Sequence, residues 1–381
     1  MQHIYVFGST QFMKISPFKI ERYFARYEFN VDYVLCGSDC ESVTIAQLLS
    51  LEPDAADRFH QLWLGYTESQ GGHALRQEIC KIYRNITTEK VLVHTGAEEA
   101  IFLFMHAMLA SGDHVIVHWP CYQSLMEVAR SIGCDVTLWK ADEEKGWALD
   151  PDDLQQMIKP HTRVIVVNTP HNPTGYLMHP DAFQKISRIA SDNGILLFSD
   201  EVYRESEYRI EDRLPAACDF GAHTVSLGVM SKTYGLPGLR IGWIATQNED
   251  VHKRMAVLKD YTTICNSAPS EFLAELALRH REALVERTQQ IIRANLNVLD
   301  GFFDRHADRF AWQRPEAGTI GFPKFLGGDV EDFCDALVKA AGVLLLPGIV
   351  YDDPGNHFRI GFGRKNMPGA VGRLEGFLQN A

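Results

Sequence analysis

Long apolar segments are missing from this sequence of 381 residues. Its longest apolar stretches, such as residues 342–347, are far shorter than the roughly 20 residues that a membrane-spanning helix needs. Residues 1–9 also lack the basic start and the apolar run of a secretory signal. We therefore expect a cytoplasmic protein that has no membrane partner.

Clustered metal-ligating residues are missing as well. The eight cysteines are scattered along the chain, and Cys36 and Cys40 form the only close pair. No second cysteine or histidine cluster stands at the spacing of a zinc site. The cysteines are therefore expected to be free thiols in a reducing compartment, and no metal site is predicted.

The sequence has no excess of positive charge. It carries 37 Lys and Arg against 49 Asp and Glu, which gives a formal net charge of -12. This balance argues against nucleic acid or an anionic membrane surface as the main partner. A local basic pocket can still bind an anion, so the overall charge does not settle the substrate.

The residues that are present describe a globular protein of more than one domain. Hydrophobic residues make up 46% and charged residues 23% of the chain. The length exceeds what a single compact core usually reaches, so one large domain and one smaller domain are expected.

The middle of the chain alternates short apolar runs with amphipathic segments. The predicted strands are residues 91–93, 114–118, 135–139, 164–168, 195–200, 224–228 and 240–246, and the predicted helices between them are 98–109, 122–132, 150–158 and 180–193. Val/Ile/Leu-rich strands that alternate with helices predict an α/β fold, with a mostly parallel sheet covered by helices on both faces.

The last third of the chain has a different pattern. Residues 271–303 have helical periodicity and many charges, and they are expected to form long helices that leave the first domain. Beyond them, short strands (318–325, 343–346, 357–362) alternate with helices (330–341, 368–379). We predict a small α+β domain over residues 286–381, a large domain over 46–285, and an N-terminal segment, 1–45, that packs on the small domain.

A lysine in a glycine-rich loop is the first candidate for chemistry. Lys232 follows a predicted buried strand in Ser231-Lys232-Thr233-Tyr234-Gly235-Leu236-Pro237-Gly238, and Arg240 is expected at the start of the next strand. Most lysines are solvated surface charges. A lysine that forms a Schiff base must instead be partly desolvated, and a nearby arginine suits a phosphate dianion.

Polar residues also follow two other predicted strands, at the edge where open α/β folds bind ligands. Asn172 lies in a Pro-rich turn and is expected to direct its amide toward a ligand. Asp200 ends an apolar strand, where a carboxylate is costly unless it is paired, and a protonated pyridine nitrogen would be such a partner. Tyr203 comes three residues later and can reach the same ring.

Four further residues extend the candidate set. Ala97 and Glu98 follow a strand and a glycine, so their backbone N–H groups form a candidate anion site at a helix start. Tyr122 stands just beyond another strand, where it either packs in the core or stacks on a flat cofactor. Arg359 lies inside an apolar strand without an acidic neighbour, which is typical of an arginine that binds a substrate carboxylate.

Together these segments resemble the class I/II aminotransferases, which are fold type I enzymes dependent on pyridoxal 5'-phosphate (PLP), from about residue 66 to the C-terminus. The resemblance implies that Lys232 holds PLP as a Schiff base and shuttles the α-proton, while Asp200 pairs with the pyridine nitrogen. It further implies contacts from Asn172 and Tyr203 to the phenolic oxygen, stacking by Tyr122, and a phosphate site of Ala97, Glu98, Ser231 and Arg240.

The resemblance also implies how substrate and partner bind. Arg359 would hold the α-carboxylate of an amino acid or a 2-oxo acid, with Gly37 and Asn172 in the same substrate-binding set. Tyr66 matches a tyrosine that reaches the phosphate of the neighbouring subunit, which implies a homodimer with shared active sites.

The sequence departs from the common aminotransferase pattern in two places. Val229 stands three residues before the lysine, where the family usually has a hydroxyl residue, and Ser231 is the candidate replacement. The segments 18–29, 33–42 and 318–323 are similar to the capreomycidine-synthase-like branch. Enzymes of that branch use PLP to eliminate a β-hydroxyl group from a hydroxyarginine and close a ring.

Three functions are therefore considered. The leading one is an aminotransferase, and the first alternative is PLP-dependent β/γ-elimination or cyclisation on an arginine-like amino acid. A guanidinium group needs counter-charges, for which Asp39, Glu41 and Glu98 are candidates. A non-catalytic binding or regulatory module predicts loss of the lysine or the aspartate, yet both Lys232 and Asp200 are present. The substrate side chain, and the step that follows loss of the α-proton, stay open.

Overall fold

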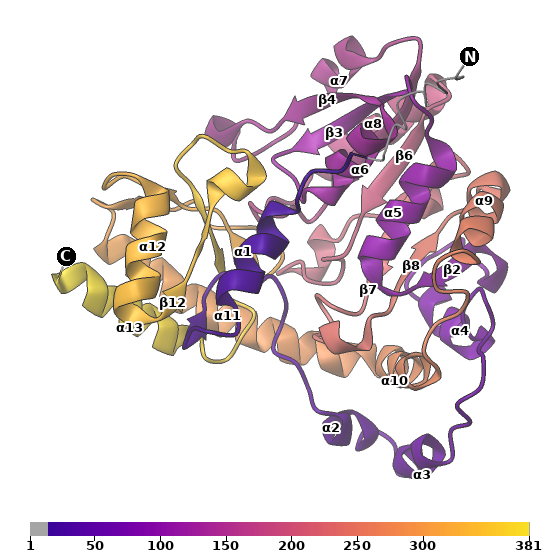
Figure 1. Cartoon of the computed structure of the whole chain (residues 1–381), viewed down its shortest axis with the longest axis horizontal. Helices are drawn as coiled ribbons and strands as arrows, with labels where there is room; N and C mark the ends of the chain where they lie inside the picture. Colours follow the sequence, from indigo (N-terminus) through magenta and orange to yellow (C-terminus); the bar gives the residue numbers. More distant parts are fainter. Residues whose placement is uncertain (1–13, 381) are drawn as a thin grey trace, which may run out of the picture.

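The computed structural model describes residues 14–380, so the first 13 residues of the N-terminal segment lie outside it. Figure 1 shows a large domain around a central sheet and a smaller domain, in yellow and orange, beside it. The predicted α/β architecture with two domains is confirmed. In the described range, no helix is long and apolar enough to cross a membrane, and no group of three or more His, Cys, Asp or Glu residues is placed to hold a metal ion.

The large domain is built on a seven-stranded sheet in the order β2-β8-β7-β6-β5-β3-β4. Its strands are β2 Val91–His94, β3 His114–Trp119, β4 Asp135–Lys140, β5 Thr162–Asn168, β6 Leu196–Asp200, β7 Thr224–Val229 and β8 Gly242–Ala245. All neighbours pair in parallel except β8, which runs antiparallel to both β2 and β7. The sheet is therefore mixed but mostly parallel, as predicted.

Both faces of this sheet are buried because every second strand residue packs to the same side. In β5, Val164 and Val166 pack with one set of helices, while Ile165 and Val167 pack with the other. The first set is α5 Gly96–Met108, α6 Ser124–Ile132 and α9 Glu249–Lys259; the second is α7 Pro151–Met157 and α8 Pro180–Asp192. Helices α4 His73–Cys80 and α10 Ala268–Arg279 form a separate core with residues of β2 and β8.

The small domain contains the C-terminal part of the chain and the N-terminal segment. Its elements are α11 Arg281–Arg305, β9 Phe310–Ala311, β10 Ile320–Gly321, β11 Lys324–Phe325, α12 Val330–Ala341, β12 Val343–Leu344, β13 Leu346–Pro347, β14 Phe358–Gly361 and α13 Met367–Asn380. The short strand β1, Tyr33–Val34, pairs in parallel with β12, which ties the N-terminal segment to this domain. The boundary predicted at 285/286 falls within the continuous helix α11.

Two predicted strands of the small domain are wrong. Residues 343–346 are divided into β12, which pairs with β1, and β13, which pairs with β14. Residues 318–325 do not form one strand, because β10 and β11 are separated and have different partners. β10 pairs with β14, whereas β11 pairs with β9, so the chain leaves one short sheet for another between Gly321 and Lys324.

Helix α1, Lys19–Tyr27, lies between the two domains (Figure 1). The backbone N–H of Lys19 donates to Gln123 Oε1 of the large domain at 2.8 Å, and Tyr23 Oη donates to the carbonyl of Leu345 in the small domain at 3.0 Å. Helices α2, Ile45–Leu49, and α3, Ala55–His60, continue from this segment along the edge of the large domain. The N-terminal segment therefore contacts both walls of the space between the domains.

Candidate active site

A cavity of about 420 Å³ opens at the carboxyl ends of the parallel strands, where the two domains and α1 meet. Ten of the twelve predicted site residues line it: Gly37, Ala97, Glu98, Tyr122, Asn172, Asp200, Tyr203, Ser231, Lys232 and Arg240. The other two, Tyr66 and Arg359, lie outside its lining. Parallel strands end at one edge of a sheet, so motifs far apart in sequence meet there.

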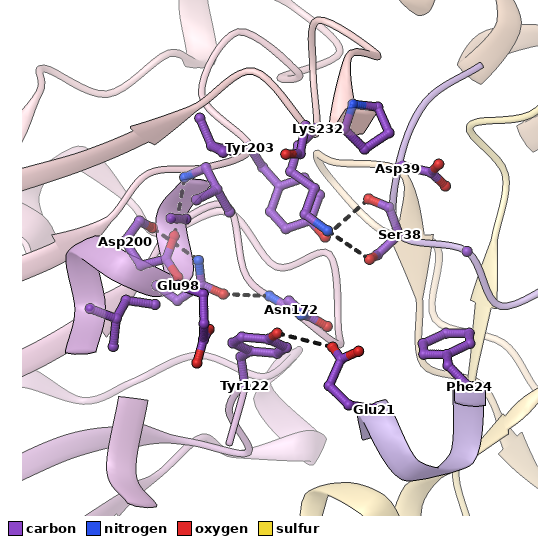
Figure 2. A pocket seen from close by; sticks show the side chains of 18 of the residues that line it. Glu21, Phe24, Ser38, Asp39, Glu98, Tyr122, Asn172, Asp200, Tyr203 and Lys232 are labelled. Atoms are coloured by element: carbon purple, nitrogen blue, oxygen red, sulfur yellow. Dashed lines mark hydrogen bonds between the residues drawn. The ribbon is translucent and has the colours of Figure 1, made fainter. Parts of the chain in front are cut away.

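Lys232 lies in the loop that follows β7. Its side-chain amine donates a hydrogen bond to Ser38 Oγ at 2.9 Å (Figure 2). Burial, together with the positive charge of Arg359, lowers the pKa of Lys232 to about 8. A substantial fraction of this amine is therefore neutral near physiological pH, which is the state in which a lysine acts as a nucleophile or a base.

Asp200 ends β6 inside the cavity wall and is only 4% exposed. Its carboxylate accepts one hydrogen bond, from the backbone N–H of Val202 at 3.1 Å. Burial raises the pKa of Asp200 to about 7, which the hydrogen bond and the charge of Lys232 oppose only in part. Such a carboxylate favours a cationic partner, since an adjacent positive charge stabilises its ionised form.

Asn172, Tyr351 and Arg359 form a buried hydrogen-bonded group behind the cavity. Asn172 Oδ1 accepts from Tyr351 Oη at 3.0 Å and from Arg359 Nη1 at 3.3 Å, and Tyr351 Oη also accepts from Arg359 Nη1 at 2.6 Å. With both donors on Oδ1, the amide nitrogen of Asn172 is the atom left to donate into the cavity. The network thus fixes which way this amide points.

Arg359 itself is 1% exposed and has an unused donor. Its Nε donates to the carbonyl of Cys36 at 3.0 Å, while Nη2 has no hydrogen-bond partner among the described residues. A buried guanidinium group with a free donor suits a carboxylate, because the pair forms charge-assisted hydrogen bonds.

Tyr203 and Tyr122 frame the cavity from two elements. Tyr203 Oη donates to the carbonyl of Ser38 at 3.2 Å, so the predicted hydrogen bond to a cofactor oxygen requires this donor to change partner. Tyr122 Oη donates to Glu21 Oε1 at 3.3 Å, and the Tyr122 ring faces the cavity in Figure 2.

The first turn of α5 forms the candidate anion site. Gly96 has φ +82, and a Cβ there would lie 2.7 Å from Arg240 Nη2, so only glycine lets the arginine approach this helix start. The N–H groups of the first turn of a helix have no partner within the helix, which makes this end attractive to a phosphate. The buried Ser231 lines the same cavity, while Val229 contributes an apolar side chain.

The structure corrects two sequence-based expectations, one about Arg240 and one about Glu41. Arg240 does not lie in a strand: it follows the short turn Pro237–Leu239 with φ +51, and β8 begins at Gly242. Glu41 does not line the cavity, because its carboxylate accepts from the backbone N–H of Lys365 at 2.9 Å. Asp39 and Glu98, the other two acidic candidates, do line the cavity.

Sequence reasoning missed part of the wall. Glu21, Phe24 and Glu28 line the cavity from α1 and its C-terminal end, and Ser38 and Arg364 line it from two loops. The spacing i, i+3, i+7 of Glu21, Phe24 and Glu28 puts them on one side of a helix, and this was the available signal.

The described residues fit PLP. Asp200 offers the buried anion that a protonated pyridine nitrogen needs, and Lys232 offers a desolvated amine for the aldehyde carbon. The glycine at the start of α5, with Arg240 against it, suits the phosphate. The amide nitrogen of Asn172, which also lines the cavity, is free to donate to an oxygen of the ring.

This fold and this cavity define the class of protein: an α/β protein with a cavity at the carboxyl edge of its sheet whose residues fit PLP. The family model described as "Aminotransferase class I and II" matches residues 39–374. The chain therefore belongs to the class I and II aminotransferase family, and its cofactor is PLP.

The relatives of this chain include more than one kind of enzyme. A capreomycidine synthase from Streptomyces vinaceus is 29% identical over 86% of this chain and 84% of its own length, and an aspartate aminotransferase from Geobacillus stearothermophilus is 27% identical over 76% and 77%. Among solved structures, a PLP-dependent aminotransferase from Streptococcus suis has a TM-score of 0.91 at 31% identity, covering 97% of this chain and 99% of its own. The PLP-dependent cyclase OrfR has a TM-score of 0.87 at 31% identity, covering 98% and 100%.

The Tyr351 hydroxyl can be tested separately from the arginine that it contacts. Tyr351→Phe removes one of the two donors on Asn172 Oδ1 and the acceptor for Arg359 Nη1. We expect amino-acid binding to weaken about fivefold, since one hydrogen bond contributes about 1 kcal/mol. A titration of cofactor absorbance with amino acid measures this change. Tyr83→Phe, which loses a bond from Trp243 away from the cavity, is the control and should leave the titration unchanged.

Proposed function

We propose that this protein is a PLP-dependent aminotransferase that moves an amino group between an L-amino acid and a 2-oxo acid. The observation that carries the proposal is that Lys232 and Asp200 line the same cavity. Burial there lowers the pKa of the amine and raises the pKa of the carboxyl group. Groups whose pKa values are shifted in this way are typical of catalytic sites.

Lys232 has two tasks in this proposal. Its amine would hold the cofactor and would become free once an amino acid is bound. The free Nζ atom would then accept the proton of the substrate α-carbon and donate it again. PLP, when bound, supplies the electron sink that makes this α-proton acidic enough to remove.

The other residues orient the cofactor, the substrate and the lysine amine. Asp200 keeps the ring nitrogen protonated, and the amide nitrogen of Asn172 donates to the phenolic oxygen of the ring. Arg359 holds the substrate carboxylate through its free Nη2. Ser38 holds the free amine of Lys232 by the hydrogen bond that the structure records, which keeps the amine near the α-carbon between its two proton transfers.

A second candidate reaction is elimination or cyclisation on an arginine-like amino acid. It is favoured by the likeness to capreomycidine synthase and to the cyclase OrfR, and by carboxylates in the cavity wall. Both candidates use Lys232 to remove the α-proton, and they differ only in the bond that changes afterwards.

We also propose that two copies of the chain share their active sites. Tyr66 is 86% exposed and lies outside the cavity of its own chain, and the neighbouring Trp63 and Leu64 are similarly exposed. Contiguous exposed apolar residues are typical of a protein–protein contact. This arrangement supports a Tyr66 side chain that reaches a second subunit.

A single-turnover assay separates the two reactions. The PLP-loaded protein is mixed with L-arginine, a hydroxyarginine or L-aspartate, and the products are identified by mass. We expect the cofactor to be recovered as pyridoxamine phosphate together with a 2-oxo acid. Recovery of PLP with ammonia or a cyclic amino acid would establish the second candidate instead, and the absence of any product would contradict both.

A further inference from the structure

We infer that α1 and its C-terminal end form a subsite for a positively charged substrate side chain, in which Glu21 and Glu28 determine specificity. This inference rests on the proposed function, because it assumes an amino acid whose carboxylate is held by Arg359. It adds the part of the substrate that is recognised and the residues that recognise it.

The three residues concerned lie on one side of α1. Glu21, Phe24 and Glu28 all line the cavity, and Figure 2 shows Glu21 and Phe24 extending from the helix toward it. The hydrogen bond from Tyr122 orients the Glu21 carboxylate at the cavity. One turn of a helix rises about 5.4 Å, so Glu21 leaves the segment about one turn before Phe24 and Glu28 about one turn after it.

The substrate is brought to this wall by Arg359. The guanidinium carbon of Arg359 lies 5.9 Å from the centre of the Phe24 ring, and its unused Nη2 is fully buried. A carboxylate bound by this guanidinium group would therefore lie in the neighbourhood of Phe24. The remainder of a bound amino acid is then within reach of the carboxylates one turn to either side.

The charges that line the cavity are not balanced. Asp39 is neutralised by Arg364, with Nη2 of the arginine 2.9 Å from Oδ2. Lys232, Asp200 and Arg240 are assigned to the cofactor. Glu21, Glu28 and Glu98 then remain, and none of them forms a salt bridge within residues 14–380.

The environments of Glu28 and Glu98 favour a nearby cation, whereas Glu21 is exposed and lies at the open side of the cavity wall. Burial raises the pKa of Glu28; the charge of Arg364 opposes this rise in part, and the charges of Asp39 and Glu21 add to it. Burial raises the pKa of Glu98 to about 7, although Ser124 Oγ donates to it at 3.1 Å. A guanidinium or ammonium group would relieve this cost and can also lie on the Phe24 ring.

The same charges disfavour an acidic substrate. The side-chain carboxylate of aspartate would lie against Glu21 and Glu28, and like charges repel one another, most strongly beside the partly buried Glu28. This chain is therefore expected to differ in side-chain preference from its relatives named as aspartate aminotransferases.

A binding experiment tests the subsite without requiring turnover. The probe is 5-guanidinopentanoate, which keeps the carboxylate and the guanidinium group of arginine but lacks the amino group that reacts. Its affinity for the PLP-loaded protein is compared by calorimetry with those of heptanoate and adipate. We expect 5-guanidinopentanoate to bind at least about tenfold more tightly than either. Equal or tighter binding of adipate would overturn the inference.

Variants assign the preference to α1. Glu21→Gln and Glu28→Gln keep the shape of the side chain and remove its charge. Each should lower the affinity for 5-guanidinopentanoate about tenfold and leave the affinity for heptanoate unchanged. Glu331→Gln, at an exposed position on α12, is the matched control and should change neither affinity. If both α1 variants keep the wild-type affinity for 5-guanidinopentanoate, the subsite is not there. A protein that binds no PLP fails the proposed function instead, which a visible spectrum recorded beforehand detects.

Discussion

Replacement of Lys232 by alanine is expected to abolish the visible absorption of the PLP-loaded protein and to lower turnover about 10³-fold or more. The covalent link to PLP and both proton transfers use the same Nζ atom, so one substitution removes all three. The spectrum after addition of PLP and removal of the excess measures the link, and steady-state kinetics measure the turnover. Visible absorption that persists in Lys232→Ala would refute the central assignment.

Two further variants make this result specific. Lys232→Arg keeps a positive charge at the site but cannot form a Schiff base, so it should behave like the alanine variant. Lys339→Ala removes an exposed lysine on α12 and should leave the spectrum unchanged. An intact spectrum in Lys232→Arg would mean that the charge, and not the covalent link, holds the cofactor.

The lowered pKa of Lys232 predicts how the capture of PLP by this amine depends on pH. Below its pKa of about 8, the amine of the cofactor-free protein is mostly protonated and cannot attack an aldehyde. The rate of PLP capture should therefore rise about tenfold for each pH unit up to about 8 and level off above it. Stopped-flow absorbance over this range measures the rate, and a plateau that begins only near pH 10.5 would show an ordinary, solvated lysine.

Much of the site could be predicted because it follows from local pattern. Asn172 and Lys232 come after apolar strands and Asp200 ends one, and parallel strands end at one edge, so their assembly needs only the sheet. Arg240 was placed in a strand because Arg240 and Ile241 precede a clear apolar run. Its left-handed backbone and the approach of its side chain to Gly96 belong to the tertiary structure, which no local pattern records.

The residues that were missed come together only through tertiary contacts. The hydrogen bond between Glu21 and Tyr122 joins positions 101 apart in sequence, and the bond between Tyr351 and Asn172 joins positions 179 apart. Side-chain periodicity could show that Glu21, Phe24 and Glu28 share one side of a helix, but not which domain that side faces. The placement of α1 between the domains gives the segment its connection with the site.

The second large effect is expected for the replacement of Asp200 by asparagine. This substitution should lower turnover but raise the stability of the cofactor-free protein. Asn cannot keep the ring nitrogen protonated, so turnover of the PLP-loaded protein should fall about 10²- to 10⁴-fold, as measured by steady-state kinetics. Asp304→Asn, which changes an exposed acid on α11, should retain full turnover. Wild-type turnover in Asp200→Asn would remove the aspartate from its assigned role.

Without cofactor, the same substitution should stabilise the protein. The folded-state pKa of Asp200 is raised to about 7, so between its ordinary pKa of 3.8 and that value the folded protein binds more protons than the unfolded chain. The contribution of Asp200 to the free energy of unfolding therefore falls as the pH rises through this range, and it is fully unfavourable above pH 7. Asp200→Asn removes that penalty, so the melting temperature of the cofactor-free variant at pH 8 should exceed that of the wild type. Bound PLP should reverse the order, because only the wild type gains an ion pair with the ring. The same order of melting temperatures with and without PLP would mean that the Asp200 carboxylate is not the partner of the cofactor.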